Sequence, residues 1–397
     1  MNKAIRCERK QSGTPGSRMY TLIFRIVRLW LGRRQRVEID DAPLRALRGP
    51  YILLANHESF FDFYYISQMA HPRRPSFLVN EYYCTRPILK TMARRGGILS
   101  KKLFTKDISA PVGILRMIRA GWPVVIFPEG RLSPDGRSNP IVEKGAAFYK
   151  KLGCDLVLVK IDGAYFAAPK WRRRQYRSTI SVKVERVLTK DELRAIPDEA
   201  LERLIAGTLY NDASESGRNR YPQRDKAVGL ETLLYRCADC GALYSTRGEG
   251  CELVCGACGA RHRLNEHYRF DDEIATIGGY YERIAEAEKE TLSDFRLQTA
   301  VRTTIFGADG GPVRHEDGVC TLTPACFSYR SASMDFSIPT EKLPALAFSC
   351  NKEFELYREG ELCYFYPKEN ARQAARWALL VDLMRKEREG GLGREKG

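Results

Sequence analysis

Short apolar runs alternate with segments of helical periodicity through the first half of the chain. Uninterrupted apolar runs are typical of buried strands, and apolar residues three and four positions apart are typical of helices that pack on one side. The pattern predicts strands at residues 36–40, 51–55, 76–79, 98–100, 124–127, 156–161 and 179–188, and helices at 60–69, 81–93, 110–120, 143–152 and 191–209. This alternation predicts an α/β domain with a largely parallel sheet flanked by helices.

The second half has a different pattern. A helix predicted at 272–289 is followed by short alternating runs with turn signals between them, and then by a last amphipathic helix at 370–386. The runs predict strands at 298–305, 319–322, 326–329, 335–338, 346–349, 354–358 and 362–366. The order of elements resembles the pleckstrin-homology or GRAM-like barrel, which implies a small β-rich, barrel-like domain closed by a C-terminal helix. A scaffold without a ligand is the alternative.

The N-terminal region predicts a loose tail and then an amphipathic helix. Residues 18–32 are apolar except for a stripe spaced three and four apart, formed by Arg18, Thr21, Arg25, Arg28 and Gly32. An apolar helix with an arginine stripe suits a bilayer interface, and further arginines after residue 32 favour this interpretation. A helix packed on the domain with a solvated arginine edge is the alternative.

The composition indicates an anionic partner and a reducing compartment. The chain has 397 residues, enough for two or three domains, and a formal net charge of +16. That charge indicates either nucleic acid or the anionic face of a membrane. No apolar run reaches the roughly twenty residues that a spanning helix needs, and arginines interrupt the N-terminal run where a secretory signal would lie. Twelve cysteines without an export signal indicate metal ligation rather than disulfides.

A histidine and an acidic residue follow the strand predicted at 51–55, in the stretch Asn56-His57-Glu58-Ser59-Phe60-Phe61-Asp62. The carboxylate of Asp62 can hold one ring nitrogen of His57 and fix the tautomer, which leaves the other nitrogen to take a proton. A general base of this kind contributes roughly a hundred- to ten-thousand-fold in rate. The alternative is that both residues cap a helix.

A second polar stretch, Pro128-Glu129-Gly130-Arg131, follows the strand predicted at 124–127. Together the two stretches resemble the glycerophospholipid acyltransferase family, which includes 1-acyl-sn-glycerol-3-phosphate acyltransferases and carries Asn-His-x4-Asp and Phe-Pro-Glu-Gly blocks. Ligands of parallel sheets lie beyond the carboxyl ends of the strands, where both stretches fall. The resemblance covers about the first half of the chain.

The resemblance implies a site in which His57 is the catalytic base and Asp62 orients it. It implies these substrate-binding residues: Asn56, Lys101, Lys102, Glu129, Gly130, Arg131 and Lys144. Lys102 falls where the family has a phosphate-binding arginine, and Arg131 stands one place earlier than in the commonest family form. Glu129 is expected either to accept hydrogen bonds from glycerol hydroxyls or to order its loop. Solvated surface lysines are the alternative for Lys102 and Lys144.

The reaction implied is transfer of a fatty acyl group from acyl-CoA or acyl-carrier protein to the free hydroxyl of a lysophospholipid. The acceptor most directly implied is 1-acyl-sn-glycerol-3-phosphate, with other lysophospholipids or glycolipids as alternatives. Backbone amides near the motif helix are expected to stabilise the oxyanion. We expect peripheral or monotopic attachment to the cytoplasmic face of a membrane.

Four cysteines predict a structural zinc site: Cys237, Cys240, Cys255 and Cys258. Two Cys-x2-Cys pairs at this spacing give tetrahedral thiolate coordination without an open position and resemble a zinc ribbon. Cys251, His262 and His267 are nearby substitutes, and Cys251 is expected to be a bystander. Because ribbons often bind nucleic acid, a non-enzymatic nucleic-acid or protein-binding module is the rival function, although we do not expect a nucleic-acid partner.

The predicted domain organisation has six parts. A tail with the amphipathic helix (1–34) precedes an acyltransferase domain (35–210) and a linker (211–230). A zinc ribbon (231–270), a helix with the β-rich domain (271–388) and a disordered tail (389–397) complete the chain.

Overall fold

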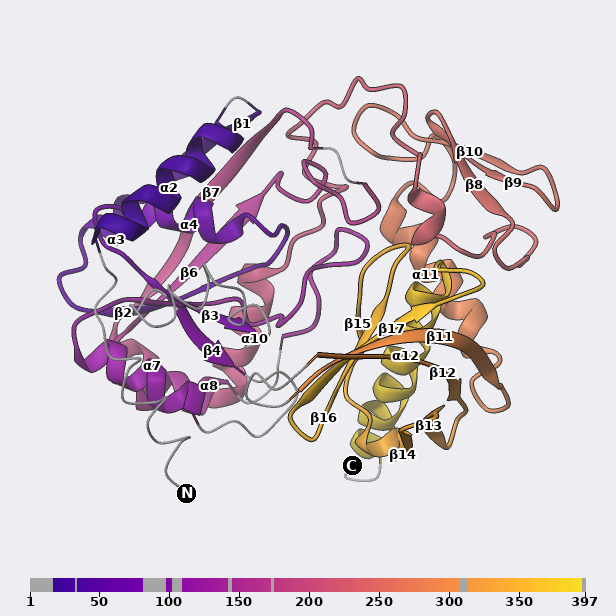
Figure 1. The fold of residues 1–397 in the computed structure, drawn as a ribbon. Helices are drawn as coiled ribbons and strands as arrows, with labels where there is room; N and C mark the ends of the chain where they lie inside the picture. Colours follow the sequence, from indigo (N-terminus) through magenta and orange to yellow (C-terminus); the bar gives the residue numbers. More distant parts are fainter. Residues whose placement is uncertain are drawn as a thin grey trace. The chain divides into compact units, whose positions relative to one another are not determined.

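A computed structural model describes residues 17–32, 34–80, 98–101, 109–141, 145–172, 175–307 and 313–394. The chain divides into two compact units (Figure 1). The first comprises Met1–Pro169 and Arg174–Arg220, and the second comprises Lys170–Arg173 and Tyr221–Gly397. The N-terminal tail and the helix predicted at 81–93 lie outside the described residues.

A seven-stranded sheet forms the centre of the first unit, in the order β1-β7-β6-β2-β5-β3-β4. Its strands are β1 (Gln35–Asp40), β2 (Tyr51–Ala55), β3 (Ser76–Asn80), β4 (Ile98–Lys101), β5 (Val124–Ile126), β6 (Asp155–Asp162) and β7 (Ser178–Leu188). The neighbours from β6 to β4 are parallel, whereas β7 is antiparallel to β6 and parallel to β1. The predicted, largely parallel α/β domain is confirmed, and it places the carboxyl ends of β2 and β5 side by side.

Helices cover both faces of this sheet (Figure 1). One face carries α2 (Ser17–Leu31), α3 (Ala42–Arg45) and α4 (Asp62–Ala70), and the other carries α7 (Ser109–Arg119), α8 (Ala146–Lys151), α9 (Lys190–Ala195) and α10 (Asp198–Leu209). In β2, Tyr51, Leu53 and Ala55 enter the first core, and Ile52 and Leu54 enter the second. Because both faces of the strand are buried, its sequence is a continuous apolar run.

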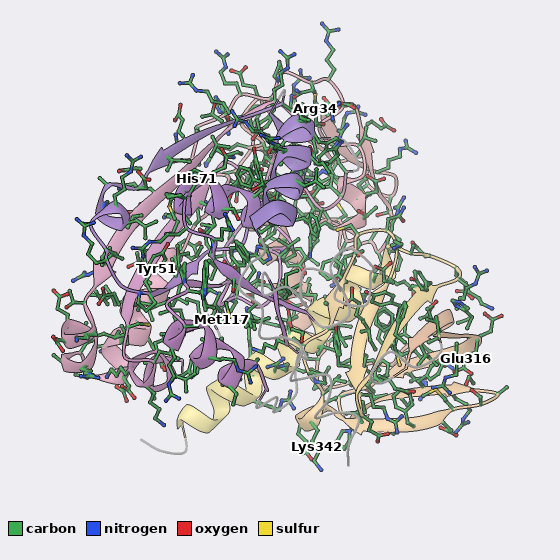
Figure 2. All side chains as sticks on the ribbon, turned by 60° about the vertical axis from the view of Figure 1, so that its left-hand side comes forward. Arg34, Tyr51, His71, Met117, Glu316 and Lys342 are labelled. Atoms are coloured by element: carbon green, nitrogen blue, oxygen red, sulfur yellow. The ribbon has the colours of Figure 1, made fainter. Side chains whose placement is uncertain are left out.

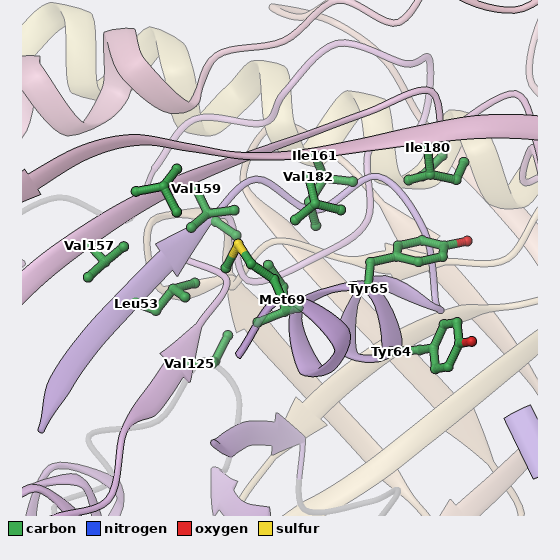
Figure 3. Close-up of a cluster of buried hydrophobic side chains, with 14 of the residues drawn as sticks. Leu53, Tyr64, Tyr65, Met69, Val125, Val157, Val159, Ile161, Ile180 and Val182 are labelled. Atoms are coloured by element: carbon green, nitrogen blue, oxygen red, sulfur yellow. The ribbon is translucent and has the colours of Figure 1, made fainter. Parts of the chain in front are cut away.

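The core under α4 determines where the first turn of this helix lies. Figure 3 shows Tyr65 and Met69 of α4 over the sheet residues Leu53, Val159 and Val182. A large-to-small change at such a buried side chain typically costs about 2–5 kcal/mol. This packing therefore holds the start of α4, where the motif ends, firmly against the sheet.

Several predicted helix boundaries differ from the structure, among them the starts of α8 (Ala146–Lys151), α11 (Ile277–Lys289) and α12 (Gln373–Arg394), and two differences have a clear local cause. α4 begins at Asp62 rather than at residue 60, because the Asp62 carboxylate accepts the amide of Ser59 and closes a turn before the helix. The helical stretch predicted at 191–209 is divided into α9 and α10 around Pro197. Proline lacks an amide hydrogen and favours an extended residue before it, as Ile196 is with ψ of 129°.

α2 packs on the sheet with one apolar stripe and exposes another. Phe24, Val27 and Leu31 contact the core, whereas large apolar side chains on its outer side are solvent-exposed: Leu22, Ile26, Leu29 and Trp30. Within the described part of the chain, no helix combines the length and the apolar character needed to cross a bilayer.

The second unit begins with a three-stranded ribbon in the order β10-β9-β8. The ribbon contains β8 (Thr246–Glu249), β9 (Glu252–Cys255) and β10 (Arg261–Arg263), and it lies between the short helix η1 (Leu230–Thr232) and α11 (Ile277–Lys289). Hydrogen bonds join it to the rest of this unit. The amide of Ala238 donates to Tyr280 Oη of α11 at 3.0 Å, and Arg372 Nη1 donates to the carbonyl oxygen of Thr246 at 2.8 Å.

A second seven-stranded sheet is antiparallel, in the order β14-β13-β12-β11-β17-β16-β15. It contains β11 (Leu297–Phe306), β12 (Val313–Leu322), β13 (Cys326–Ser331), β14 (Asp335–Pro339), β15 (Ala347–Phe348), β16 (Phe354–Arg358) and β17 (Glu361–Pro367), with η3 (Thr340–Lys342) after β14. The sheet curls into a half-barrel over α12 (Gln373–Arg394), whose fully buried Trp377 stacks on Phe354 at 4.8 Å between ring centroids. The predicted seven strands and C-terminal helix are confirmed.

Candidate active site and metal centre

His57 and Asp62 are brought together by the turn that joins β2 to α4. His57 Nδ1 lies 2.8 Å from Asp62 Oδ2, and the amide of Ser59 donates to the same oxygen at 2.9 Å. Burial raises the pKa of Asp62, and the hydrogen bonds from His57 and Ser59 act against that rise. An ionised carboxylate only accepts, so this contact places the proton on Nδ1 and leaves the lone pair on Nε2.

The His57 ring is held on its face as well as on its Nδ1 edge. It stacks on Phe127, the residue after β5, with ring centroids 4.3 Å apart and planes 17° apart. Its side chain is 22% exposed, and none of the described residues hydrogen-bonds Nε2. The ring is therefore fixed in orientation while Nε2 keeps its capacity to accept a proton.

Glu129 connects the loop after β5 to the histidine. Its Oε1 accepts the backbone amide of His57 at 2.8 Å, and its Oε2 accepts the amide of Asn139 at 2.6 Å. The carboxyl group is buried, which raises its pKa, and these hydrogen bonds oppose the rise. Of the two tasks expected for Glu129, these contacts correspond to ordering the loop.

Asn56 was expected to contact substrate, but its side chain is fully buried and contacts the sheet. Its Nδ2 donates to the carbonyl oxygen of Ile161 at 2.8 Å, and its Oδ1 accepts the amide of Ile161 at 2.7 Å. The pairing of β2 with β6 stops at Ala55 and Val159. The side-chain amide of Asn56 extends this ladder of hydrogen bonds beyond the last backbone pair.

Glu58 is a site residue that sequence reasoning missed. Its Oε2 accepts the amides of Ala164 at 2.8 Å and Tyr165 at 3.1 Å, and its Oε1 accepts the side-chain amide of Asn211. Burial raises the pKa of Glu58 well above its usual value, with smaller contributions from the carboxylates of Asp162 and Asp62. The available signal was an acidic residue between His57 and Asp62, directly after a predicted buried strand.

Three amides near the motif are already hydrogen-bonded within the protein. The amide of His57 donates to Glu129, that of Ser59 to Asp62, and that of Phe61 to Ser59 Oγ at 3.2 Å. These groups hold the turn together, so an oxyanion would have to use other donors.

The expected phosphate-binding residues are distributed over two places. Arg131 lies in the Glu129 loop, and its Nε is 3.3 Å from Asn139 Oδ1. Lys101 ends the edge strand β4, separated from β2 by β5 and β3. Gly130 is exposed in a left-handed conformation with φ of 71°, which other residues rarely adopt. Lys102 and Lys144 lie outside the described residues.

Two matching turns bring the four cysteines together. The amide of Gly241 donates to the Cys237 carbonyl, and that of Gly259 donates to the Cys255 carbonyl, both at 3.0 Å. Cys237 Sγ is 3.8 Å from Cys258 Sγ, and Cys240 Sγ is 3.8 Å from Cys255 Sγ. All four sulfurs lie within 4.8 Å of one another. Sulfurs about 2.3 Å from a tetrahedral zinc ion are about 3.8 Å apart, so this set can hold such an ion.

The nearby substitutes have other partners. His262 bridges two carboxylates, with Nδ1 2.8 Å from Asp272 Oδ2 and Nε2 2.8 Å from Asp239 Oδ2. Cys251 Sγ contacts the carbonyl oxygen of Gln223 at 3.6 Å. The four sulfurs are thus the candidate ligand set found among the described residues.

Comparisons with known proteins found a family model and a solved structure that are similar to part of this chain. Residues 35–159, which include the His57–Asp62 pair and Glu129, match the family model described as Acyltransferase. A crystal structure of the 1-acyl-sn-glycerophosphate (LPA) acyltransferase PlsC from Thermotoga maritima is similar over 47% of this chain and 73% of that chain, with 19% identity and a TM-score of 0.39.

Proposed function

Because residues 35–159 form an acyltransferase domain, we propose that this protein acylates the free hydroxyl of a lysophospholipid. The observation that carries the proposal is the contact between His57 Nδ1 and Asp62 Oδ2 at the carboxyl end of β2, with Nε2 free of described partners. The acceptor proposed first is 1-acyl-sn-glycerol-3-phosphate, which would give phosphatidate. The acyl donor is a thioester, either acyl-CoA or acyl-carrier protein.

In the proposed mechanism, His57 Nε2 removes the proton from the acceptor hydroxyl as its oxygen attacks the carbonyl carbon of the thioester. The bond between that carbon and sulfur then breaks, and the proton on Nε2 passes to the departing thiolate. Asp62 holds Nδ1 and stabilises the imidazolium between the two transfers. No acyl-enzyme intermediate is needed, since the acceptor hydroxyl is itself the nucleophile.

Other residues of the site position these groups. Glu129 binds the backbone of His57 and so sets the distance between the two motif loops. Arg131, in the same loop, and Lys101 supply cations for the acceptor phosphate, together with Lys102 and Lys144. Arg131 offers a planar fork that can bind phosphate in a bidentate manner, whereas a lysine offers a point charge.

The proposed setting is the cytoplasmic face of a membrane. The exposed apolar side chains of α2, of which Leu29 is 78% and Trp30 is 54% exposed, suit insertion at the headgroup boundary. The net charge of +16 favours an anionic surface.

The four-cysteine site has a structural role in this proposal. Four thiolates complete the coordination of zinc, which leaves no position for a substrate. The metal therefore stabilises the second unit and takes no part in acyl transfer.

The test is a transfer assay with purified protein, labelled lysolipids and both classes of donor. We expect transfer to lysophosphatidate, and we expect His57→Ala to lower the rate roughly a hundred- to ten-thousand-fold with zinc content unchanged. Turnover in that variant equal to the wild type would contradict the proposal. The rival nucleic-acid-binding function predicts strong, salt-dependent binding of DNA or RNA that does not change with His57.

A further inference from the structure

An open pocket of about 580 Å³ lies on the first unit, where the end of α2 meets the starts of β1 and β7. The charged residues described in its lining are all arginines, namely Arg34, Arg36 and Arg177. Arg34 lies beyond the end of α2 (Figure 2). The hydroxyl-bearing residues Ser178 and Thr179 also line the pocket. Such a lining is cationic and rich in donors, and it lies away from the His57 motif in the sequence.

The alternation of β1 and β7 explains why the arginines share one side. Gln35 pairs with Ser178 and Arg36 with Thr179 in the parallel register. Gln35 and Ser178 are 6% and 8% exposed, so their side chains face the core. Successive residues of a strand point to opposite faces. Arg34 and Arg36 on either side of Gln35, and Arg177 before Ser178, therefore project outward, and all three are exposed.

Most of this positive charge is not balanced by the protein. Arg36 Nε lies 3.5 Å from Glu38 Oε1. None of the described residues forms an ion pair with Arg34 or Arg177. Gln35 adds a buried amide whose Oε1 accepts from Tyr65 Oη, while its Nε2 has no hydrogen-bond partner among the described residues. Guanidinium groups match the geometry of phosphate oxygens, so a phosphate is the group that this lining suits.

We propose that this arginine pocket binds the phosphate groups of anionic lipids and so docks the first unit on a bilayer. The neighbouring helix favours a bilayer over a soluble anion as the binding partner. Gly32 lines the pocket, and the exposed Trp30 and Leu29 precede it by only two and three residues. At a rise of about 1.5 Å per helical residue, Leu29 precedes Gly32 by about 4.5 Å along the chain, so exposed apolar side chains lie close to the pocket. The inference rests on the proposed function in that the acceptor is a membrane lipid.

The test is flotation of the full-length protein with vesicles of equal parts phosphatidylcholine and phosphatidylglycerol, compared with phosphatidylcholine alone. Each arginine near an anionic surface contributes about fivefold in binding, so we expect Arg34→Gln with Arg177→Gln to weaken binding about 30-fold. The matched control is Arg186→Gln with Arg194→Gln, which removes the same charge from the far end of β7 and from α9. We expect the control to bind nearly as well as the wild type.

Wild-type binding by the pocket variant would overturn the proposal. So would an equal loss in the control pair, because binding would then depend on net charge alone, and so would full displacement from vesicles by millimolar inorganic phosphate. Transfer to an acceptor in detergent micelles tests the proposed function separately, since no bilayer is present. A wild-type protein that is inactive there, yet binds vesicles as expected, would contradict the function and leave the pocket assignment standing.

Discussion

Replacing Asn56 with alanine should destabilise the first unit. In the wild type the Asn56 amide bonds both the amide and the carbonyl oxygen of Ile161 in a fully buried position. Alanine leaves these two backbone groups of β6 without their side-chain partner. A buried polar group that loses its partner costs about 1–3 kcal/mol, so we expect a loss of about 2–6 kcal/mol in the free energy of unfolding.

Asn56→Asp is the matched variant, because it keeps the shape and one of the two hydrogen bonds. One carboxylate oxygen can still accept the Ile161 amide, but the other meets the Ile161 carbonyl oxygen, and both are acceptors. We therefore expect aspartate to be no better than alanine. A residue that contacts only substrate predicts the opposite pattern, namely a raised KM with wild-type stability.

The measurement is denaturant unfolding followed by circular dichroism, together with hydrogen exchange of the amides in β2 and β6. We expect lower unfolding midpoints and faster exchange at the carboxyl end of β6 in both variants. Wild-type midpoints and exchange with an altered KM would refute the assignment of Asn56 to the sheet.

Three further predictions concern other parts of the molecule. Glu58→Gln should gain stability relative to the wild type as the pH rises from 5 to 8. Burial raises the pKa of Glu58 in the folded chain, so the wild type loses stability as the pH rises above the unfolded pKa of about 4.3, whereas glutamine does not titrate. A difference in unfolding midpoint between the two proteins that is constant with pH would contradict this. The purified protein should contain one zinc ion per chain by elemental analysis. Cys258→Ala should lose this ion, and Cys251→Ala should keep it. Equal zinc content in the two variants would refute the ligand set. Leu29→Glu should weaken binding to anionic vesicles by at least tenfold, since burying a leucine contributes about 1.5–3 kcal/mol. Val112→Glu, which places the same charge at another exposed apolar position, on α7, should not weaken it.

Local pattern predicted the elements that carry the site. β2 and β5 are short apolar runs with both faces buried, so periodicity identified them and adjacent polar residues marked their carboxyl ends. The contact between His57 and Asp62 spans five residues and one turn, and it too was predictable. The break at Pro197 also had a local signal, the Ile-Pro pair, which the helical periodicity on either side obscured.

Contacts between distant parts of the chain could not be predicted in the same way. Asn56 bonds Ile161 and Glu58 bonds Asn211, which are separated by 105 and 153 residues. These partners are set by the order of strands and helices in the fold, which periodicity alone does not give. The same limit explains why Asn56 was expected to bind substrate: a polar residue beside the catalytic histidine has the same local signature whether it faces a ligand or the sheet.

The central claim is that Asp62 acts on the reaction through the imidazole of His57. The most direct test measures acyl transfer by His57→Ala, Asp62→Asn and the double variant in one assay, as a double-mutant cycle. If the two residues work as a pair, the double variant is no slower than His57→Ala alone, because the carboxylate has no task once the ring is gone. Rate losses that multiply would contradict the account, since each residue would then contribute independently of the other.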